Sequence, residues 1–387
     1  MFDREYFDAG LYRIGTACEK WDGVREREGR DLLPMWVADM DFPSPPAVQE
    51  ALLRRAAHPT YGYTEAEDSL YDAFRGFWSR RHDVTFSREE TTMLPCVVTG
   101  LKVAIQALTK PWDGVIIQSP VYGPFRMAVE AAGRTLMDAP LIRRDDGHYD
   151  MDLEAVEALC KAGAKLMMLC SPHNPVSRLW RKEELQALLE VLNKYGVPLV
   201  SDEIHADFVY APHRFVSVLS LQREHTIALA APSKTFNIAG LQMAFSVIPD
   251  NTIREAYRAA IDATGVVSGN IFGMEAARAA FRDGEPWLDG LLDYLEGNRA
   301  ELEQQLSANL PGAVLTPMEA TYLGWLDLRS YGYPEEELLR RTREAGVVFT
   351  NGTFFGQEAG EGFLRINIGC PRRNVVEAVR RLKEALR

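Results

Sequence analysis

The sequence predicts a large α/β domain with a mostly parallel sheet, followed by a smaller α+β domain. Through the middle of the chain, short apolar runs alternate with amphipathic helical stretches, which is typical of βαβ units whose sheet is covered on both faces. After about residue 289 the pattern changes to a long charged helix, then strands, then a terminal helix. We therefore expect a large domain over 46–289 and a small domain formed by 1–45 together with 290–387.

Apolar runs bounded by polar residues give the strands of the large domain. The five candidates are 114–120, 164–172, 196–203, 225–234 and 241–249. Between them, 182–195 predicts a helix because its leucines recur at the i, i+3, i+4 and i+7 spacing of one helix face, and 100–110 is similar. In the small domain we expect helices over 289–310 and 373–387 and strands within 320–329, 345–356 and 362–370.

Composition and charge narrow the class of protein. The 387 residues are 47% hydrophobic and 25% charged, as in an ordinary globular protein. The net charge of −12 argues against nucleic-acid binding, which needs a basic face. Five scattered cysteines without a CxxC pair indicate reduced thiols. No signal peptide and no apolar run of about 20 residues is visible, so we expect a cytoplasmic protein without membrane contacts.

Chemically useful side chains follow four of the predicted strands. Tyr122 comes after the first, Asn174 after the second, Asp202 with His205 after the third, and Lys234 after the fourth. Open α/β sheets bind ligands at the carboxyl ends of their strands, so these groups should converge on one place. A ring, an amide, a carboxylate and an amine at successive strand ends are hard to obtain by chance.

Pyridoxal 5'-phosphate (PLP) catalysis requires such a set. The cofactor's aldehyde needs a lysine for a Schiff base, which Lys234 supplies, and its pyridine nitrogen needs a carboxylate, which Asp202 supplies. Tyr122 could stack on the ring, and Asn174 could donate to its phenolic oxygen. The phosphate needs a helix N-terminus, and Val98–Gly100 begins the predicted helix.

Six motifs in a fixed order carry a family resemblance. They are WVADMDF, YGY, PVYGPF, SPHNP, SDEIHADF and SKTFNIAGL, between residues 33 and 372. In this order and spacing, the chain resembles fold-type I PLP enzymes of the aminotransferase class I/II superfamily, and within it the MalY/PatB-like branch of cystathionine β-lyases, which are carbon–sulfur lyases. The resemblance implies the fold-type I architecture, PLP as cofactor, and a homodimer with shared active sites.

The resemblance also assigns roles to individual residues. Arg365 is expected to hold the substrate's α-carboxylate, a task suited to a bidentate guanidinium. Tyr61 is expected to reach the phosphate of the neighbouring subunit. The predicted cofactor-binding residues are Lys234, Asp202, Asn174, Tyr122, His205, Val98, Thr99, Ser233 and Tyr61. The predicted catalytic residues are Lys234, Tyr122 and Tyr61, and the predicted substrate-binding residues are Arg365, Asn174, Trp36 and Asp39.

Three positions depart from the pattern of aminotransferases. His205 stands where they carry a tyrosine, and Gln242 stands where they carry a phosphate-binding arginine. Both departures are usual in the lyase branch and favour it. Ser177 stands where the family usually has glycine, which changes the turn after Asn174.

The same residues and motifs permit other interpretations of the site and of the function. His173, Asp202, Glu203 and Asp207 could be drawn as a metal cluster, but their spacing matches no zinc signature, so no metal is expected. The predicted reaction is β-elimination from cystathionine or another S-substituted cysteine to a thiol, pyruvate and ammonia, as in a cysteine-S-conjugate or cystathionine β-lyase. An aminotransferase would use the same residues. A regulatory protein that binds a transcription factor is a third possibility, with no exposed motif in its favour.

Overall fold

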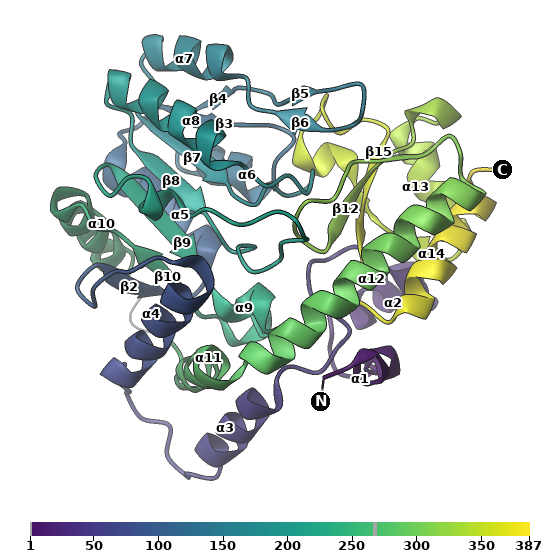
Figure 1. Ribbon diagram of the computed structural model, residues 1–387, viewed down its shortest axis with the longest axis horizontal. Helices are drawn as coiled ribbons and strands as arrows, with labels where there is room; N and C mark the ends of the chain where they lie inside the picture. The colour runs from purple at the N-terminus through teal and green to yellow at the C-terminus, as the bar shows by residue number, and fades with distance from the viewer. Residues whose placement is uncertain (1, 266–268) are drawn as a thin grey trace.

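A seven-stranded sheet forms the centre of the large domain in the computed structural model, which describes residues 2–265 and 269–387 (Figure 1). The strand order is β2-β10-β9-β8-β7-β3-β4, and β10 is the antiparallel member. The strands are β2 (Thr91–Leu94), β3 (Gly114–Ile117), β4 (Thr135–Asp138), β7 (Leu166–Cys170), β8 (Leu199–Asp202), β9 (Thr226–Ala230) and β10 (Ala244–Val247). The α/β prediction for this domain is confirmed.

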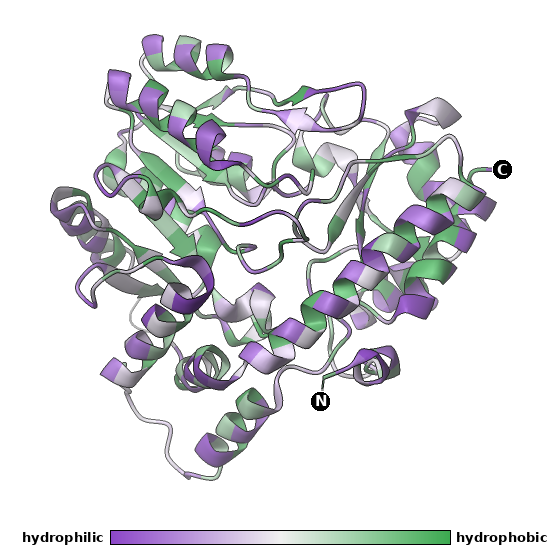
Figure 2. Cartoon of the chain, viewed as in Figure 1, coloured by the Kyte–Doolittle hydropathy of each residue, from purple (hydrophilic) through white to green (hydrophobic). Residues whose placement is uncertain are grey.

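Helices cover both faces of this sheet, because successive residues of its strands point to opposite sides. In β7, Leu166 and Met168 enter one apolar cluster while Met167 and Leu169 enter the other. The first cluster is completed by α5 (Val97–Leu108), α6 (Pro124–Ala131) and α10 (Asn251–Thr264). The second is completed by α4 (Asp68–His82), α7 (Leu153–Lys161), α8 (Lys182–Tyr195) and α11 (Ile271–Asp283). Figure 2 shows the apolar character of the strands between these helices.

All five predicted strands of the large domain are present, each shorter than its apolar run. The helix predicted over 182–195 coincides with α8, and the one predicted from residue 100 begins at Val97. The two edge strands, β2 and β4, were not predicted. Their sequences, TTML and TLMD, mix polar and apolar residues because an edge strand is only partly buried.

The smaller part of the molecule contains an antiparallel sheet in the order β11-β12-β15-β14. Its elements are β11 (Val314–Leu315), β12 (Leu323–Asp327), β14 (Thr350–Asn351), β15 (Phe363–Asn367), α12 (Glu285–Asn309), α13 (Glu335–Glu344) and α14 (Arg372–Ala385). The N-terminal arm joins it, because β1 (Leu33–Pro34) pairs in parallel with β13 (Val347–Val348). The boundary predicted at residues 289 and 290 falls inside α12 and stays a prediction.

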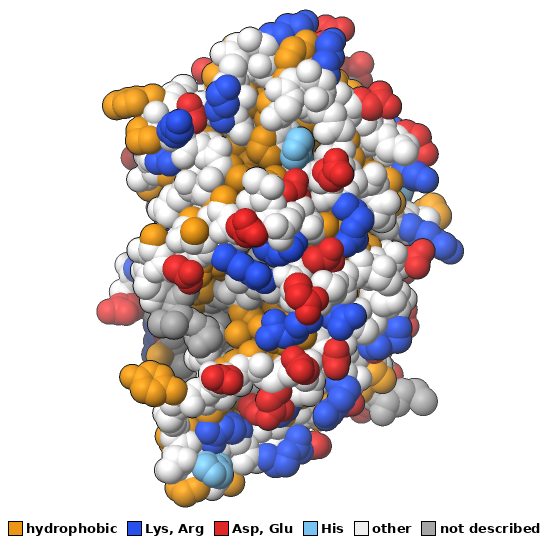
Figure 3. Space-filling model, turned by 90° about the vertical axis from the view of Figure 1, so that its left-hand side faces the viewer, with side chains coloured by type: hydrophobic (Ala, Val, Ile, Leu, Met, Phe, Trp, Pro, Cys, Tyr) orange, Lys and Arg blue, Asp and Glu red, His pale blue; other side chains and the backbone are white. Residues whose placement is uncertain are grey.

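The remaining elements are short or peripheral. They are α1 (Arg4–Ala9), α2 (Asp22–Glu28), α3 (Pro46–Ala56), β5 (Ile142–Arg143), β6 (Tyr149–Asp150) and α9 (Pro232–Thr235). Charged residues of both signs are interspersed on the face shown in Figure 3. Among residues 2–265 and 269–387, no helix has the length and apolar character that crossing a membrane requires.

Candidate functional site

A cavity of about 770 Å³ lies at the carboxyl ends of the central strands, within the size range of small-molecule sites. The sheet register places Cys170, at the end of β7, beside Asp202, at the end of β8. The segments that follow these strands therefore meet at one edge, and residues of β14 and β15 face them. The predicted site residues that line this cavity are Trp36, Val98, Tyr122, Asn174, Asp202, His205, Ser233, Lys234 and Arg365.

Lys234 lies in α9, immediately after β9, and its ammonium group is held inside the protein. Its Nζ donates a hydrogen bond to the Ala38 carbonyl oxygen at 2.5 Å. Burial lowers the pKa of Lys234 to about 8, and Arg365 adds to the effect while Asp39 and Asp202 oppose it. A lysine with this pKa presents a useful fraction of neutral amine near physiological pH, as a nucleophile or general base requires.

Asp202 is a buried carboxylate that lacks a hydrogen-bonded cation. Among the described residues, the hydrogen bond to its side chain comes from the Ile204 N–H, at 3.1 Å. Burial raises the pKa of Asp202 to about 7, against the opposing influence of that bond and of Lys234. A protonated pyridine nitrogen would supply the missing partner. The residue fits the role predicted for it toward PLP.

Arg365 is buried in β15 without a carboxylate among its contacts in the described part of the chain. Its guanidinium donates to the Trp36 carbonyl at 2.8 Å, to Thr350 Oγ1 at 3.2 Å and to Asn174 Oδ1 at 3.1 Å. Its Nε has no hydrogen-bond partner among residues 2–265 and 269–387. Burial lowers the pKa of Arg365 to about 10. An uncompensated buried cation is costly, so the site fits an incoming carboxylate. The bond to Asn174 Oδ1 leaves the Asn174 amide NH₂ for the cavity.

Tyr122 and His205 complete the walls of the cavity. Burial raises the pKa of Tyr122, so its hydroxyl stays protonated. Burial lowers the pKa of His205 to about 3, helped by Lys234 and Arg365, so its imidazole is neutral. His205 Nδ1 is buried and has no hydrogen-bond partner among the described residues. A polar cofactor atom would satisfy it.

The N-terminus of α5 opens on the same cavity. Residues 95–98 line it, and the N-cap residue, Cys96, makes no side-chain capping bond. The first backbone N–H groups of this helix are therefore available to an anion such as the cofactor's phosphate. The Thr99 hydroxyl, predicted to face the phosphate, instead lies 3.3 Å from Cys96 Sγ and does not line the cavity. The contact between Thr99 and Cys96 therefore competes with the predicted contact between Thr99 and the phosphate.

Two further predicted residues lie outside the cavity of the single chain. Tyr61 is 58% exposed on the segment between α3 and α4, and its hydroxyl donates to the Ala56 carbonyl. Its predicted role requires a neighbouring subunit and stays a prediction. Asp39 pairs with Arg13 at 2.8 Å, and its charge acts on the pKa of Lys234; its predicted contact with substrate stays a prediction.

Buried polar residues that were not predicted hold the WVADMDF segment against the site. Asn237 bonds the backbone of Met40 and the Phe42 carbonyl, and Asn367 donates to the Val37 and Asp39 carbonyls. Lys20 is fully buried and donates to Asp41 at 3.0 Å and to the Asp39 carbonyl at 3.1 Å. The pairing of distant residues such as Lys20 and Asp41 leaves no periodic signal in the sequence. A polar residue inside an apolar run, such as Asn367 in FLRINIG, is the sequence signal that could have indicated a buried polar contact.

The three departures from the aminotransferase pattern have distinct structural outcomes. His205 lines the cavity, whereas Gln242 is exposed beside α3 and does not. Ser177 adopts a left-handed conformation, with φ of 56°, which explains why glycine suits this position. The peptide bonds before Pro120 and Pro175 are cis. His173 Nε2 lies 2.9 Å from the Pro120 carbonyl oxygen, and among the described residues no group of three His, Cys, Asp or Glu side chains is placed to hold a metal ion.

Comparison with known proteins places the chain in a family. The family model described as aminotransferase class I and II matches residues 30–382. The chain belongs to this family. It is 42% identical to cystathionine β-lyase PatB of Bacillus subtilis (strain 168), over 98% of this chain and 99% of that protein.

Solved structures agree with this assignment and with the fold-type I architecture. Cystalysin from Treponema denticola, which contains PLP, matches with a TM-score of 0.94 and 31% identity, over 97% of each chain. The PLP-bound C–S lyase from Staphylococcus hominis matches with a TM-score of 0.91 and 30% identity, over 98% of this chain and 97% of that one.

Proposed function

We propose that this protein is a PLP-dependent carbon–sulfur β-lyase that cleaves cystathionine or related S-substituted cysteines to a thiol, pyruvate and ammonia. One observation carries the proposal. Among the described residues, one cavity gathers a partly buried lysine with a lowered pKa, a buried carboxylate without a hydrogen-bonded cation, and a buried guanidinium without a carboxylate. PLP with an amino-acid substrate supplies a partner for each. The relatives named as C–S lyases support the same chemistry.

Each residue then has a defined task. Bound PLP supplies an electron-withdrawing ring that makes the substrate's α-proton acidic. Arg365 would hold the α-carboxylate, and Asp202 in its ionised form would keep the ring nitrogen protonated. Asn174, neutral His205 and Tyr122 line the same cavity and would hold the ring. The N-terminus of α5, together with Ser233, binds the phosphate.

Lys234 in its neutral form removes the α-proton, since burial lowers its pKa to about 8, close to neutral pH. The β-carbon–sulfur bond then breaks, and its electron pair leaves with the sulfur. Two groups of this chain's cavity carry a proton for that thiolate: the Lys234 ammonium formed in the previous step, and the Tyr122 hydroxyl, whose pKa is raised by burial. Hydrolysis of the remaining three-carbon fragment gives pyruvate and ammonia.

The finer assignments belong to the same proposal. We place the activity with the cysteine-S-conjugate and cystathionine β-lyases, in a cytoplasmic homodimer whose subunits exchange Tyr61. The exposure of Tyr61, and of Tyr63 beside it, supports an additional contact at this segment.

The proposal is tested with the PLP-loaded protein and L-cystathionine, without any keto acid. We expect pyruvate and free thiol to appear in equal amounts. If neither appears, and the protein instead converts an amino acid and a keto acid into their transamination products, the lyase assignment is wrong and the aminotransferase alternative is correct.

A further inference from the structure

Two opposite charges at the mouth of the cavity have no ion-pair partner in the described part of the chain. Glu19 and Arg27 both line the cavity that contains Lys234 and Arg365, and both are exposed to solvent. The other charged pair of the mouth is already neutralised, because Arg343 and Glu28 form an ion pair at 3.1 Å. The mouth therefore offers one free carboxylate and one free guanidinium.

Arg27 is connected to the α-carboxylate site through Trp36. Its guanidinium lies over the Trp36 ring, 5.2 Å from the centroid, while the Trp36 carbonyl accepts from Arg365 at 2.8 Å. A cation stacked on tryptophan is held in place yet keeps its N–H groups free for a ligand. The two arginines thus contact one tryptophan, the buried Arg365 through the Trp36 backbone carbonyl and the exposed Arg27 through the Trp36 ring.

Glu19 lies in a segment that is held in place by contacts of the neighbouring residues. The next residue, Lys20, is fully buried and bonded to Asp41, and the Cys18 N–H donates to Asp22 at 2.9 Å. Glu19 lines the same cavity as Tyr122, and its charge is a minor cause, after burial, of the raised pKa of Tyr122. An ammonium group leaving the cavity beside Tyr122 would meet the Glu19 carboxylate.

We infer that Glu19 and Arg27 bind a second amino-acid head group, carried on the sulfur side of the substrate. Arg27 takes the distal carboxylate, and Glu19 takes the distal ammonium. The inference rests on the proposed function and names its substrate class: thioethers and disulfides with an amino acid at both ends, in preference to S-alkyl cysteines. A neutral tail would leave both charges without a ligand.

The test compares three substrates of the PLP-loaded protein. L-Cystathionine carries both distal charges, S-(3-carboxypropyl)-L-cysteine carries only the carboxylate, and S-propyl-L-cysteine carries neither. For Arg27→Gln we expect the ratio of kcat/KM for cystathionine to that for the propyl substrate to fall about two- to fivefold, as for an exposed charge contact. The fall should be in KM, with kcat for cystathionine maintained.

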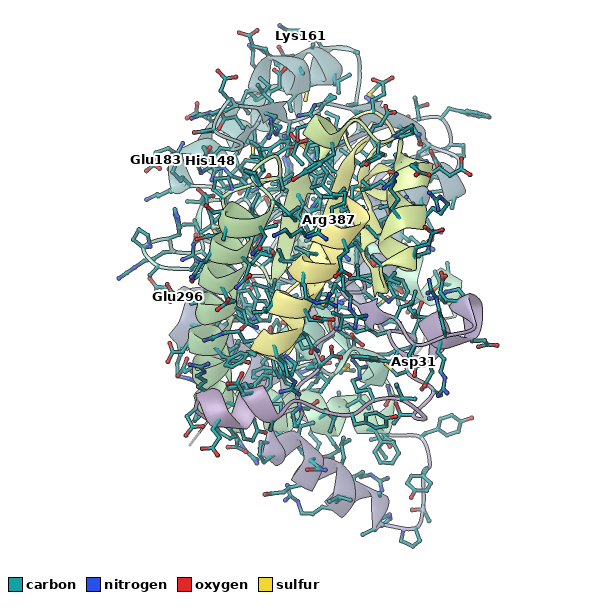
Figure 4. All side chains as sticks on the ribbon, turned by 90° about the vertical axis from the view of Figure 1, so that its right-hand side faces the viewer. Asp31, His148, Lys161, Glu183, Glu296 and Arg387 are labelled. Atoms are coloured by element: carbon teal, nitrogen blue, oxygen red, sulfur yellow. The ribbon has the colours of Figure 1, made fainter. Side chains whose placement is uncertain are left out.

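The carboxypropyl substrate separates the two residues. Arg27→Gln should lower its kcat/KM ratio to the propyl substrate as well, whereas Glu19→Gln should lower the ratio for cystathionine alone. Arg25→Gln is the matched control. Arg25 lies on the same helix, pairs with Asp31 at 3.2 Å and does not line the cavity, so its removal should leave all ratios unchanged (Asp31 is labelled in Figure 4).

The inference is overturned if Arg27→Gln and Glu19→Gln leave these ratios unchanged, or change them as much as Arg25→Gln does. Failure of the proposed function gives a different result, in which the wild-type protein releases pyruvate from none of the three substrates. Affinity for each compound, measured from the change in cofactor absorbance, then decides the inference without turnover. If the Arg27→Gln protein no longer binds cystathionine in preference to the propyl compound, the inference is supported. If the preference is unchanged, the inference is refuted.

Discussion

Replacing Asp202 with asparagine should change how the stability of the cofactor-free protein depends on pH. Burial raises the pKa of Asp202 from 3.8 to about 7, so the folded protein retains a proton that the unfolded chain has released. This contribution to stability is complete below about pH 4 and is lost as the pH rises through 7. At about 1.4 kcal/mol per pH unit between the two values, the whole loss is about 4 kcal/mol.

Chemical denaturation at pH 5 and pH 8 measures this effect. Between these two values the wild-type protein without PLP should lose about 3 kcal/mol more unfolding free energy than Asp202→Asn. Glu203→Gln is the matched control. Burial also raises the pKa of Glu203 to about 7, but its carboxylate already accepts bonds from Ser201, Ser217 and the Val218 N–H.

Adding PLP distinguishes the two carboxylates. A protonated ring nitrogen stabilises ionised Asp202, so PLP should reduce the part of the pH dependence that Asp202 causes and preserve the part that Glu203 causes. Equal losses in the wild-type and Asp202→Asn proteins would show that burial does not hold a proton on Asp202. A wild-type pH dependence unaffected by PLP would show that Asp202 does not pair with the ring.

Substitutions at three further positions test the site and the turn beside it. Lys234→Ala should abolish pyruvate release and the absorbance of the lysine-bound cofactor, and the variant should retain the native circular dichroism spectrum. Persistent pyruvate release would exclude Lys234 as the base. Ser177→Ala should lower the free energy of unfolding by about 1–3 kcal/mol, because the serine hydroxyl contacts the Ala320 and Leu323 carbonyls. Ser177→Gly should lower it less, because glycine adopts a positive φ without strain. Equal losses in the two variants would refute the role of the positive φ. Mixing Lys234→Ala with Tyr61→Phe subunits should restore activity through one intact site per heterodimer, whereas continued inactivity would place Tyr61 in its own subunit's site.

The strand-end residues could be predicted because parallel strands present their carboxyl ends at one edge of the sheet. Tyr122, Asn174, Asp202 and Lys234 needed only the apolar runs before them to be recognised as strands. Arg365 is different: it belongs to β15 of the other sheet, 131 residues after Lys234, and only the family resemblance indicated it. Its contact with Asn174 depends on how the two parts of the chain pack, which local sequence does not encode.

Local contacts compete with two of the predicted site contacts, and the roles of Thr99 and Asp39 stay predictions. A threonine at a helix N-terminus can face a ligand or bond a neighbouring side chain, and the same sequence permits both. Here the Thr99 hydroxyl contacts Cys96. Asp39 is predicted to bind substrate; in the single chain its Oδ2 pairs with Arg13, from a distant part of the arm, and its charge acts on the pKa of Lys234.

Ser177 shows how a departure visible in the sequence acquires its reason only from distant contacts. Its positive φ disfavours any residue except glycine, so the serine needs a compensating interaction. The compensation comes from a segment more than 140 residues away. Thr321 Oγ1 lies 2.9 Å from the Ser177 hydroxyl, and the Ala320 and Leu323 carbonyl oxygens each lie 2.7 Å from it, as acceptors for its one proton. Thr321 itself has a φ of 63°. The two strained residues therefore support each other, and replacing Thr321 with valine should destabilise the wild-type protein more than the Ser177→Gly variant.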